Sequence, residues 1–238
     1  MKICIFGAGA IGGYLAVELA LAGNDVCVIA RGAHLDAIRK NGLTLLINGQ
    51  EKNARIPASD NPADFGPQDY VICALKAHQS YESAAQFTPL LGPDTAMVTA
   101  MNGIPWWYFY KEGGKFEGRH LESVDAGARQ WNLIGPERAI GCVVEVIAPG
   151  IIEHHEFNRF ILGEPDGSES DRVKTLSEIM KAAHFDAPIR NAIRWNVWLK
   201  LWGNVCFNPI SALTHATLDQ ITSGALREIC KKAIYETK

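Results

Sequence analysis

The sequence predicts an α/β protein with a doubly wound, mostly parallel sheet, followed by a region made of helices alone. Apolar strand patterns alternate with helical patterns up to residue 100, as in parallel sheets whose strands are joined by helices. A glycine-rich turn, GAGAIG, joins the first strand to the first helix. After Pro188 only helical patterns follow, so we expect one domain over residues 1–188 and the start of a second over residues 189–238.

The expected elements follow the spacing of the apolar residues, which repeats every second residue in a strand and about every 3.6 residues in a helix. In chain order, the expected strands cover residues 2–6, 25–29, 43–47, 52–56, 70–75, 95–100, 139–147 and 150–162. The expected helices cover residues 10–22, 33–40, 80–90 and 171–183. Asn48-Gly49 is a hairpin-type turn between the third and fourth strands.

Two stretches lack clear boundaries. Residues 111–137 contain several glycines and scattered charges without a clear period, so we expect a surface excursion there. Residues 224–238 keep a helical spacing up to the last residue, without a glycine or proline stop. The helical domain is then short for an independent core, because short chains bury too little surface. We therefore expect it to be incomplete.

The composition excludes several classes of protein. The 238 residues are 47% hydrophobic and 21% charged, which is ordinary for a globular protein. The formal net charge is -3 and there is no basic run, so nucleic acid is not an expected partner. No stretch reaches about 18 consecutive apolar residues, and the N-terminus does not have the pattern of a signal peptide. We expect no association with a membrane.

The cysteines and histidines do not suggest a metal site. Six cysteines occur without a Cys-x-x-Cys pair, and most lie in apolar runs. This pattern favours buried free thiols in a reducing compartment, so we expect a cytoplasmic protein without disulfides. His154-His155 is an adjacent pair, but no third ligand follows at a useful spacing. No metal is therefore expected.

The turn GAGAIG fits the G-x-G-x-x-G pattern of Rossmann dinucleotide-binding domains, directly after a strand and at the start of a helix. In that pattern the first glycine permits the tight turn, the second lets the backbone approach a pyrophosphate, and the third allows helix and strand to pack closely. The helix N-terminus offers N–H groups and a partial positive charge to phosphates. The alternative is a purely structural turn. The predicted cofactor-binding residues here are Gly7, Ala8, Gly9, Ala10, Ile11 and Gly12.

The end of the second strand, VCVIARG, indicates which dinucleotide binds. NAD sites usually have an acidic residue there for the ribose 2′-hydroxyl. Residues 26–33 contain no Asp or Glu, and Arg31 lies there instead. A guanidinium suits a 2′-phosphate and can stack on adenine. We therefore predict NADPH/NADP as the cofactor, the alternative being that Arg31 is a solvated loop residue.

Two more strand ends carry polar residues, Lys76 in CALKAHQ and Asn102 in AMNGIPWW. In open α/β sheets, ligands bind beyond the carboxyl ends of the strands, where the strand order reverses. We therefore expect both side chains at the crevice that holds the cofactor. His78 and Glu145 also have titratable side chains, but nothing in the sequence favours a site role for them over an ordinary surface position.

A polar stripe follows on the first helix of the C-terminal region. Asn196, Lys200, Asn204 and Asn208 are four residues apart and so share one helix face, and Lys200 is the one charged residue between positions 195 and 214. The residues around them are apolar, and a helix that is apolar on nearly all sides is usually buried. Because buried polar groups need partners, we expect the stripe to face a polar cavity.

This stripe suits the reduction of a keto acid. An ammonium group can donate a hydrogen bond to a carbonyl oxygen, stabilise the negative charge that develops as hydride arrives, and then protonate that oxygen. Amides on neighbouring turns can hold a carboxylate or a hydroxyl without adding charge. A small anionic keto acid is the substrate class that these groups favour.

These segments together resemble the ketopantoate reductase (2-dehydropantoate 2-reductase) family. The resemblance rests on GAGAIG with Arg31, on LKAHQ and MNG, and most specifically on KLWGNVCFNPISALT. It implies NADPH-dependent reduction of ketopantoate to pantoate in pantothenate and coenzyme A synthesis. It also implies that Lys76 and Asn102 lie against cofactor and substrate, that Lys200 is the general acid, and that Asn204 and Asn208 bind substrate.

The resemblance also implies a longer helical domain, whose further part carries a substrate-binding serine and an acidic residue. We therefore expect a truncated C-terminal domain. Two alternatives remain open, namely a truncated homologue that binds NADPH without turnover and a related Rossmann reductase that acts on another 2-keto acid. A homodimer through the helical region is a further expectation.

Overall fold

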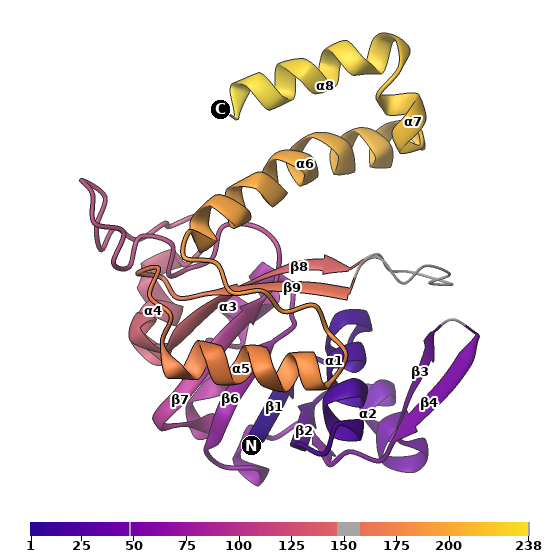
Figure 1. The fold of residues 1–238 in the computed structure, drawn as a ribbon, viewed down its shortest axis with the longest axis vertical. Coiled ribbons are helices and arrows are strands. Elements are labelled where there is room, and N and C mark those ends of the chain that lie inside the picture. The colour runs from indigo at the N-terminus through magenta and orange to yellow at the C-terminus, as the bar shows by residue number, and fades with distance from the viewer. Residues whose placement is uncertain (48, 147–157, 238) are drawn as a thin grey trace.

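The computed structural model describes residues 1–47, 49–146 and 158–237. Its main sheet has the strand order β5-β2-β1-β6-β7-β8-β9, with parallel neighbours apart from the antiparallel pair β8–β9 (Figure 1). The strands of this sheet are β1 (Lys2–Phe6), β2 (Asp25–Ile29), β5 (Ala58–Ser59), β6 (Gln68–Cys73), β7 (Leu91–Ala100), β8 (Ala139–Val146) and β9 (Asn158–Gly163). Strands β3 (Leu43–Ile47) and β4 (Gln50–Ala54) form a separate hairpin.

Helices cover both faces of the sheet, which confirms the predicted α/β fold. The helices around the sheet are α1 (Ala10–Leu21), α2 (Gly32–Asn41), α3 (Ala77–Glu82), α4 (Arg129–Ile134) and α5 (Asp171–Ala182), with 3-10 helices at Pro62–Asp64, Ala84–Leu90, Ala126–Ala128 and Pro136–Arg138. Leu15 of α1 and Leu176 of α5 belong to the core on one face. Phe87 and Ile134 belong to the core on the other face.

Strand β1 shows why this region forms a sheet that is buried on both sides. Ile3 and Ile5 join the core beneath α1 and α5, whereas Cys4 and Phe6 join the opposite core, and all four are buried. Because successive side chains of a strand point to opposite faces, a central parallel strand has to be apolar at every position. The segment KICIF meets that requirement.

Several expected boundaries are corrected. Strand β4 begins at Gln50, where it pairs with Ile47, so the hairpin turn is tighter than expected. The single helix expected over residues 80–90 is the helix α3 followed by a 3-10 helix that contains Pro89, which has no N–H for a regular helical hydrogen bond. Strands β8 and β9 occupy the expected strand regions, but residues 147–157, which include His154-His155, lie outside the described residues.

The surface excursion expected over residues 111–137 is wrong in its second half. Asp125 is 2% exposed, and its carboxylate accepts hydrogen bonds from the backbone N–H groups of Gln130 at 2.7 Å and Trp131 at 3.0 Å. These bonds satisfy the N-terminus of α4, where a negative charge is favourable. Gln130 in turn accepts a hydrogen bond from the Ser80 hydroxyl at 2.7 Å. A six-residue helix is too short to show a period in the sequence.

The C-terminal region is helical, as predicted. It consists of α6 (Ile193–Thr214), α7 (Leu218–Ile221) and α8 (Gly224–Glu236), and α8 returns beside α6 (Figure 1). Cys206, Ile221 and Cys230 form a small shared core. The expectation that α6 is buried is only half right, since Trp195 and Leu199 are 57% and 51% exposed.

Helix α6 is held against the sheet by its first two turns. Ile193 and Val197 lie in the same core as Val143 of β8. The guanidinium of Arg194 donates hydrogen bonds to the backbone carbonyls of Tyr108, Tyr110 and Pro165. The close fit is visible at Gly141 of β8, where a Cβ would lie 2.7 Å from Ile193 Cγ1 and 2.9 Å from the ring of Trp107.

We expect Gly141→Ala to loosen this attachment. The added methyl group forces Ile193 or the buried Trp107 to move, and overpacking of this kind costs about 1–3 kcal/mol of unfolding free energy. Urea denaturation followed by circular dichroism measures the change. Gly203→Ala is the matched control, since a Cβ there meets nothing within 4 Å. Equal midpoints for the two variants would show that Gly141 is not needed for the packing.

The predicted state of the cysteines is confirmed, because all six are free and buried. In the described part of the chain, no helix is both long and apolar enough to cross a membrane. The described residues also contain no group of three or more His, Cys, Asp or Glu side chains arranged as metal ligands.

Candidate functional site

The predicted site residues lie along one edge of the sheet, where β1, β2, β6, β7 and β8 end, here called the carboxyl edge. The parallel pairing brings these five strand ends into register at this edge (Figure 1). The glycine turn follows β1, Arg31 follows β2, Lys76 follows β6 and Asn102 follows β7. The carboxyl edge is where ligands of open α/β sheets bind.

The glycine turn has the geometry that its sequence predicts. Gly7 has a φ of 100°, a backbone conformation that glycine adopts without strain, and its N–H donates to the Ile29 carbonyl at 3.0 Å. A Cβ on Gly12 would overlap the carbonyl oxygen of Gly7, so α1 packs on the turn at a distance that excludes any side chain. A Cβ on Gly9 would meet no atom within 4 Å. The space in front of Gly9 is therefore open to a ligand.

The N-terminus of α1 leaves donors available at this open space. Gly9 is the N-cap residue and no side chain caps the helix. The first N–H groups of a helix have no partner within it, and they suit a phosphate together with the positive end of the helix dipole. The residues present at this turn therefore fit the pyrophosphate of a dinucleotide.

Arg31 lies beside the glycine turn as the N-cap residue of α2, with an exposed side chain. A residue that the sequence reasoning missed lies three positions later. The ring nitrogen Nε2 of His34 lies 2.8 Å from the carbonyl oxygen of Ala8 and so joins α2 to the glycine turn. Nothing in the local sequence marks this contact, because it joins segments that follow two different strands.

Lys76 and Asn102 occupy the positions that the strand pattern predicts. Lys76 is the N-cap residue of α3, its backbone N–H donates to Gln79 Oε1 at 3.2 Å, and its side chain is exposed. Asn102 is exposed two residues after the end of β7. Both residues are therefore exposed at the carboxyl edge.

The polar stripe of α6 lines a cavity of about 320 Å³ at the end of β8. Lys200 and Asn204 are half-buried there and Asn208 is exposed, which matches the predicted polar cavity. Asn196 is not among the lining residues. The complete lining is Glu145, Leu199, Lys200, Gly203, Asn204, Phe207, Asn208 and Leu218.

Glu145 is the unexpected member of this cavity. It lies at the end of β8, on the strand next to the one that leads to Asn102. Its carboxylate oxygen Oε2 is 3.9 Å from Nη1 of Arg159, a long ion pair, and Arg159 is itself fixed by a 2.5 Å hydrogen bond from its Nε to Asp186. The cavity thus has a cation on α6 and an anion on β8.

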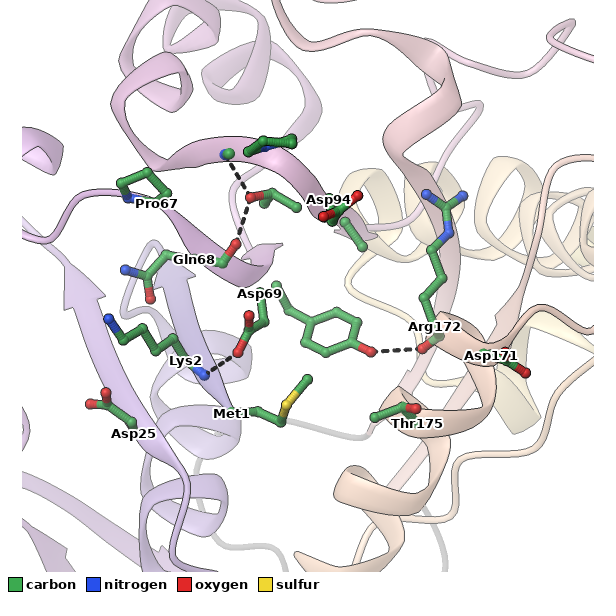
Figure 2. A pocket seen from close by; sticks show the side chains of 15 residues that line it. Met1, Lys2, Asp25, Pro67, Gln68, Asp69, Asp94, Asp171, Arg172 and Thr175 are labelled. Atoms are coloured by element: carbon green, nitrogen blue, oxygen red, sulfur yellow. Dashed lines mark hydrogen bonds between the residues drawn. The ribbon is translucent and has the colours of Figure 1, made fainter.

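A larger cavity, of about 780 Å³, lies at the opposite edge of the sheet (Figure 2). Several of its polar groups are paired with one another. Lys2 N–H donates to Asp69 at 2.7 Å, and the Tyr70 hydroxyl donates to the carbonyl of Arg172 at 2.8 Å. Burial raises the pKa of Tyr70 to about 12, so this hydroxyl stays protonated as a donor. Size alone therefore does not locate the site, because this cavity is at the amino ends of the strands.

The arrangement brings two sets of groups to one edge. The glycine turn fits the pyrophosphate of a dinucleotide, with Arg31 beside it, and the cavity of Lys200 offers hydrogen-bond donors to a small anion. The lining of that cavity does not include the glycine turn or Asn102. The structure therefore places both sets on the same side of the sheet without enclosing them in one pocket.

Comparison with known proteins fits this arrangement. The family model described as ketopantoate reductase PanE/ApbA matches residues 3–105, and the model of the C-terminal part of that family matches residues 192–238. The 2-dehydropantoate 2-reductase of Mesorhizobium japonicum is 54% identical over 228 residues, which cover 94% of this chain and 70% of that protein.

Two solved structures from proteins with names of the same family are similar to this chain. The crystal structure of a protein named as a candidate ketopantoate reductase from Ralstonia solanacearum is 41% identical, with a TM-score of 0.92 over 99% of this chain and 75% of that one. The 2-dehydropantoate 2-reductase of Geobacter metallireducens is 25% identical, with a TM-score of 0.80 over 100% of this chain and 74% of that one. On these sequence matches, with the glycine turn and the stripe in place at the carboxyl edge, the chain belongs to the ketopantoate reductase family.

Proposed function

We propose that the protein reduces ketopantoate (2-dehydropantoate) to pantoate with NADPH, as a step of pantothenate and coenzyme A synthesis. The observation that carries this proposal is the meeting of Lys200, Asn204 and Asn208 at one cavity beside the carboxyl edge. Bound NADPH supplies the hydride that reduces the 2-keto carbon. The remaining chemistry, which is orientation of the substrate and delivery of a proton, falls to the side chains of this chain.

In this proposal Lys200 is the general acid. Its ammonium group donates a hydrogen bond to the keto oxygen, stabilises the charge that develops there, and transfers a proton to it. Asn204 and Asn208 lie on the next turns of the same helix face, so their amides hold the polar groups of the substrate while Lys200 contacts the reacting oxygen. Asn102 approaches from the end of β7 and contacts both substrate and cofactor.

The cofactor is held by the carboxyl edge of the first domain. The N–H groups of the glycine turn, over Gly7–Gly12, bind the pyrophosphate, and the open space at Gly9 receives it. Arg31 binds the 2′-phosphate, because its guanidinium is matched in charge and geometry to phosphate oxygens. Lys76 adds a positive charge toward the cofactor from the end of β6.

We expect Arg31→Asp to reverse the preference between the two dinucleotides. Loss of a charge-assisted bond to the 2′-phosphate, with a new repulsion in its place, should raise the Kd for NADPH about 100-fold. The Kd for NADH should change by less than about threefold, since NADH has no phosphate there. Fluorescence titration with each dinucleotide measures both values. Arg227→Asp on the exposed side of α8 is the control, and equal losses for both dinucleotides would contradict the role of Arg31.

The proposed reaction is tested by adding ketopantoate to the purified protein with NADPH. We expect NADPH to be consumed in a one-to-one ratio with the pantoate formed. A panel of other 2-keto acids distinguishes a relative with a different substrate, for which another acid would give the higher kcat/KM. Thermal stabilisation by NADPH without turnover of any 2-keto acid would identify a binding protein and contradict the proposal.

A further inference from the structure

Helix α6 crosses β8 in a register that brings Glu145 opposite the polar stripe. Alternate residues of β8 face α6, namely Gly141, Val143 and Glu145. Gly141 lies under Ile193, and Val143 shares a core with Val197 one turn later. The next turn of α6 brings Lys200, and the next residue of that face of β8 is Glu145, so both line the same cavity.

The cavity has two chemically different walls. On α6, Lys200, Asn204 and Asn208 offer N–H donors to negative oxygens. On β8, an ionised Glu145 is an acceptor only, so it attracts a hydroxyl or a cation and repels a carboxylate. The apolar side chains of Leu199, Phe207 and Leu218 also line the cavity. A volume of about 320 Å³ is at the lower end of the usual range for ligand pockets, about 300–1,000 Å³, and suits a small molecule.

These walls fix the orientation of a hydroxylated keto acid. Ketopantoate has a carboxylate and a keto oxygen at one end and a hydroxyl at the other. The anionic end is drawn to the α6 wall, which places the hydroxyl toward β8. We propose that Glu145 accepts the hydrogen bond of the substrate's hydroxyl and so selects 2-keto acids that carry a hydroxyl at the end away from the carboxylate. This inference rests on the proposed function and adds a specificity-determining residue to it.

Arg159 supports Glu145 in this role. Its guanidinium is anchored by Asp186 and lies 3.9 Å from the Glu145 carboxylate, too far for a hydrogen bond that would occupy the carboxylate oxygen. At that distance it offsets part of the negative charge beside an anionic substrate. The side chain of Glu145 is 33% exposed, so its carboxylate is accessible from the cavity.

The test compares ketopantoate with trimethylpyruvate, which has the same carbon skeleton and lacks only the hydroxyl. The wild-type protein should prefer ketopantoate, because a site built to bind a hydroxyl leaves its acceptor unpaired with the analogue. Glu145→Ala should lower kcat/KM for ketopantoate about 100-fold, mainly through KM, and leave kcat/KM for trimethylpyruvate unchanged or higher. Glu145→Gln, which retains an acceptor oxygen, should recover part of the ketopantoate activity.

The control variant is Glu178→Ala, on the exposed side of α5, which should match the wild type with both substrates. An equal loss for both substrates in Glu145→Ala would mean that Glu145 acts only on the structure of the site and would overturn the inference, while the proposed reaction stands. Unchanged kinetics with both would overturn it as well. If the wild-type protein oxidises NADPH with neither substrate, the proposed function fails, and the assignment of Glu145 fails with it.

Discussion

Replacing Lys200 with alanine is expected to lower kcat for ketopantoate reduction at least about 100-fold, because general acid catalysis of this kind contributes about 10²- to 10⁴-fold. Lys200 is the one charged residue on its part of α6, and it lies between the first turns that pack on β8 and the amides of Asn204 and Asn208. No neighbouring lysine or arginine on that helix face can take over the proton. The loss should appear in kcat more than in the affinity for NADPH, since the glycine turn is not among the residues that line the cavity of Lys200.

A second variant at position 200 distinguishes the loss of the transferable proton from the loss of the positive charge, and a lysine variant elsewhere is its control. Lys200→Arg keeps a positive charge, but its guanidinium does not release a proton at neutral pH. Its kcat should therefore be nearly as low as that of Lys200→Ala, while its KM for ketopantoate should be lower than that of Lys200→Ala. Lys232→Ala, on the exposed side of α8, is the matched lysine control and should turn over normally. Steady-state kinetics at saturating NADPH measure all three. Full turnover by Lys200→Ala would show that another group protonates the product.

Substitutions in the glycine turn are expected to have the second large effect. Alanine at position 12 should lower both stability and NADPH binding, whereas alanine at position 9 should lower NADPH binding alone. In Gly12→Ala the new Cβ overlaps the Gly7 carbonyl, and neither backbone segment can move without shifting α1 from the sheet. We expect a loss of about 3 kcal/mol or more in unfolding free energy, together with loss of NADPH binding. In Gly9→Ala the Cβ enters open space, so the stability of the ligand-free protein should be unchanged.

The Cβ of Gly9→Ala points into the space assigned to the pyrophosphate, so its affinity for NADPH should still fall at least about tenfold. Gly13→Ala is the control, since its Cβ lies 3.6 Å from the Ala8 carbonyl oxygen, an ordinary contact, and alanine favours a helix by about 0.5–1 kcal/mol. Thermal melts with and without NADPH distinguish the three variants. Normal NADPH binding by Gly9→Ala would mean that the pyrophosphate lies elsewhere.

The sequence allowed the fold, and the position at one sheet edge of the residues proposed to bind the cofactor, to be predicted because both depend on local patterns. The turn at Gly7 is set by neighbours in the chain, and parallel pairing then brings the ends of β1, β2, β6 and β7 to one edge. Glu145 could not be found in this way. Its position opposite Lys200 depends on how α6 packs on β8. The spacing of apolar residues along either segment does not reveal that packing.

The stripe itself was predicted with one residue too many, for a geometric reason. Four residues exceed a turn of an α-helix by about 40°, so residues spaced by four drift around the helix. From Asn196 to Asn208 the drift exceeds a quarter of the circumference, and the cavity is lined by Lys200, Asn204 and Asn208 but not by Asn196. Spacing alone does not show which part of a drifting stripe faces the cavity.

The central claim is that the carboxyl edge and the α6 stripe form one reaction site. It is tested most directly by a single-turnover reaction with NADPH that carries deuterium at the transferred position. The claim predicts that mass spectrometry finds the deuterium on C2 of pantoate, the carbon next to the carboxylate, quickly with the wild-type protein and at least about 100-fold more slowly with Lys200→Ala. Tight binding of the labelled NADPH without any transfer to ketopantoate would contradict it.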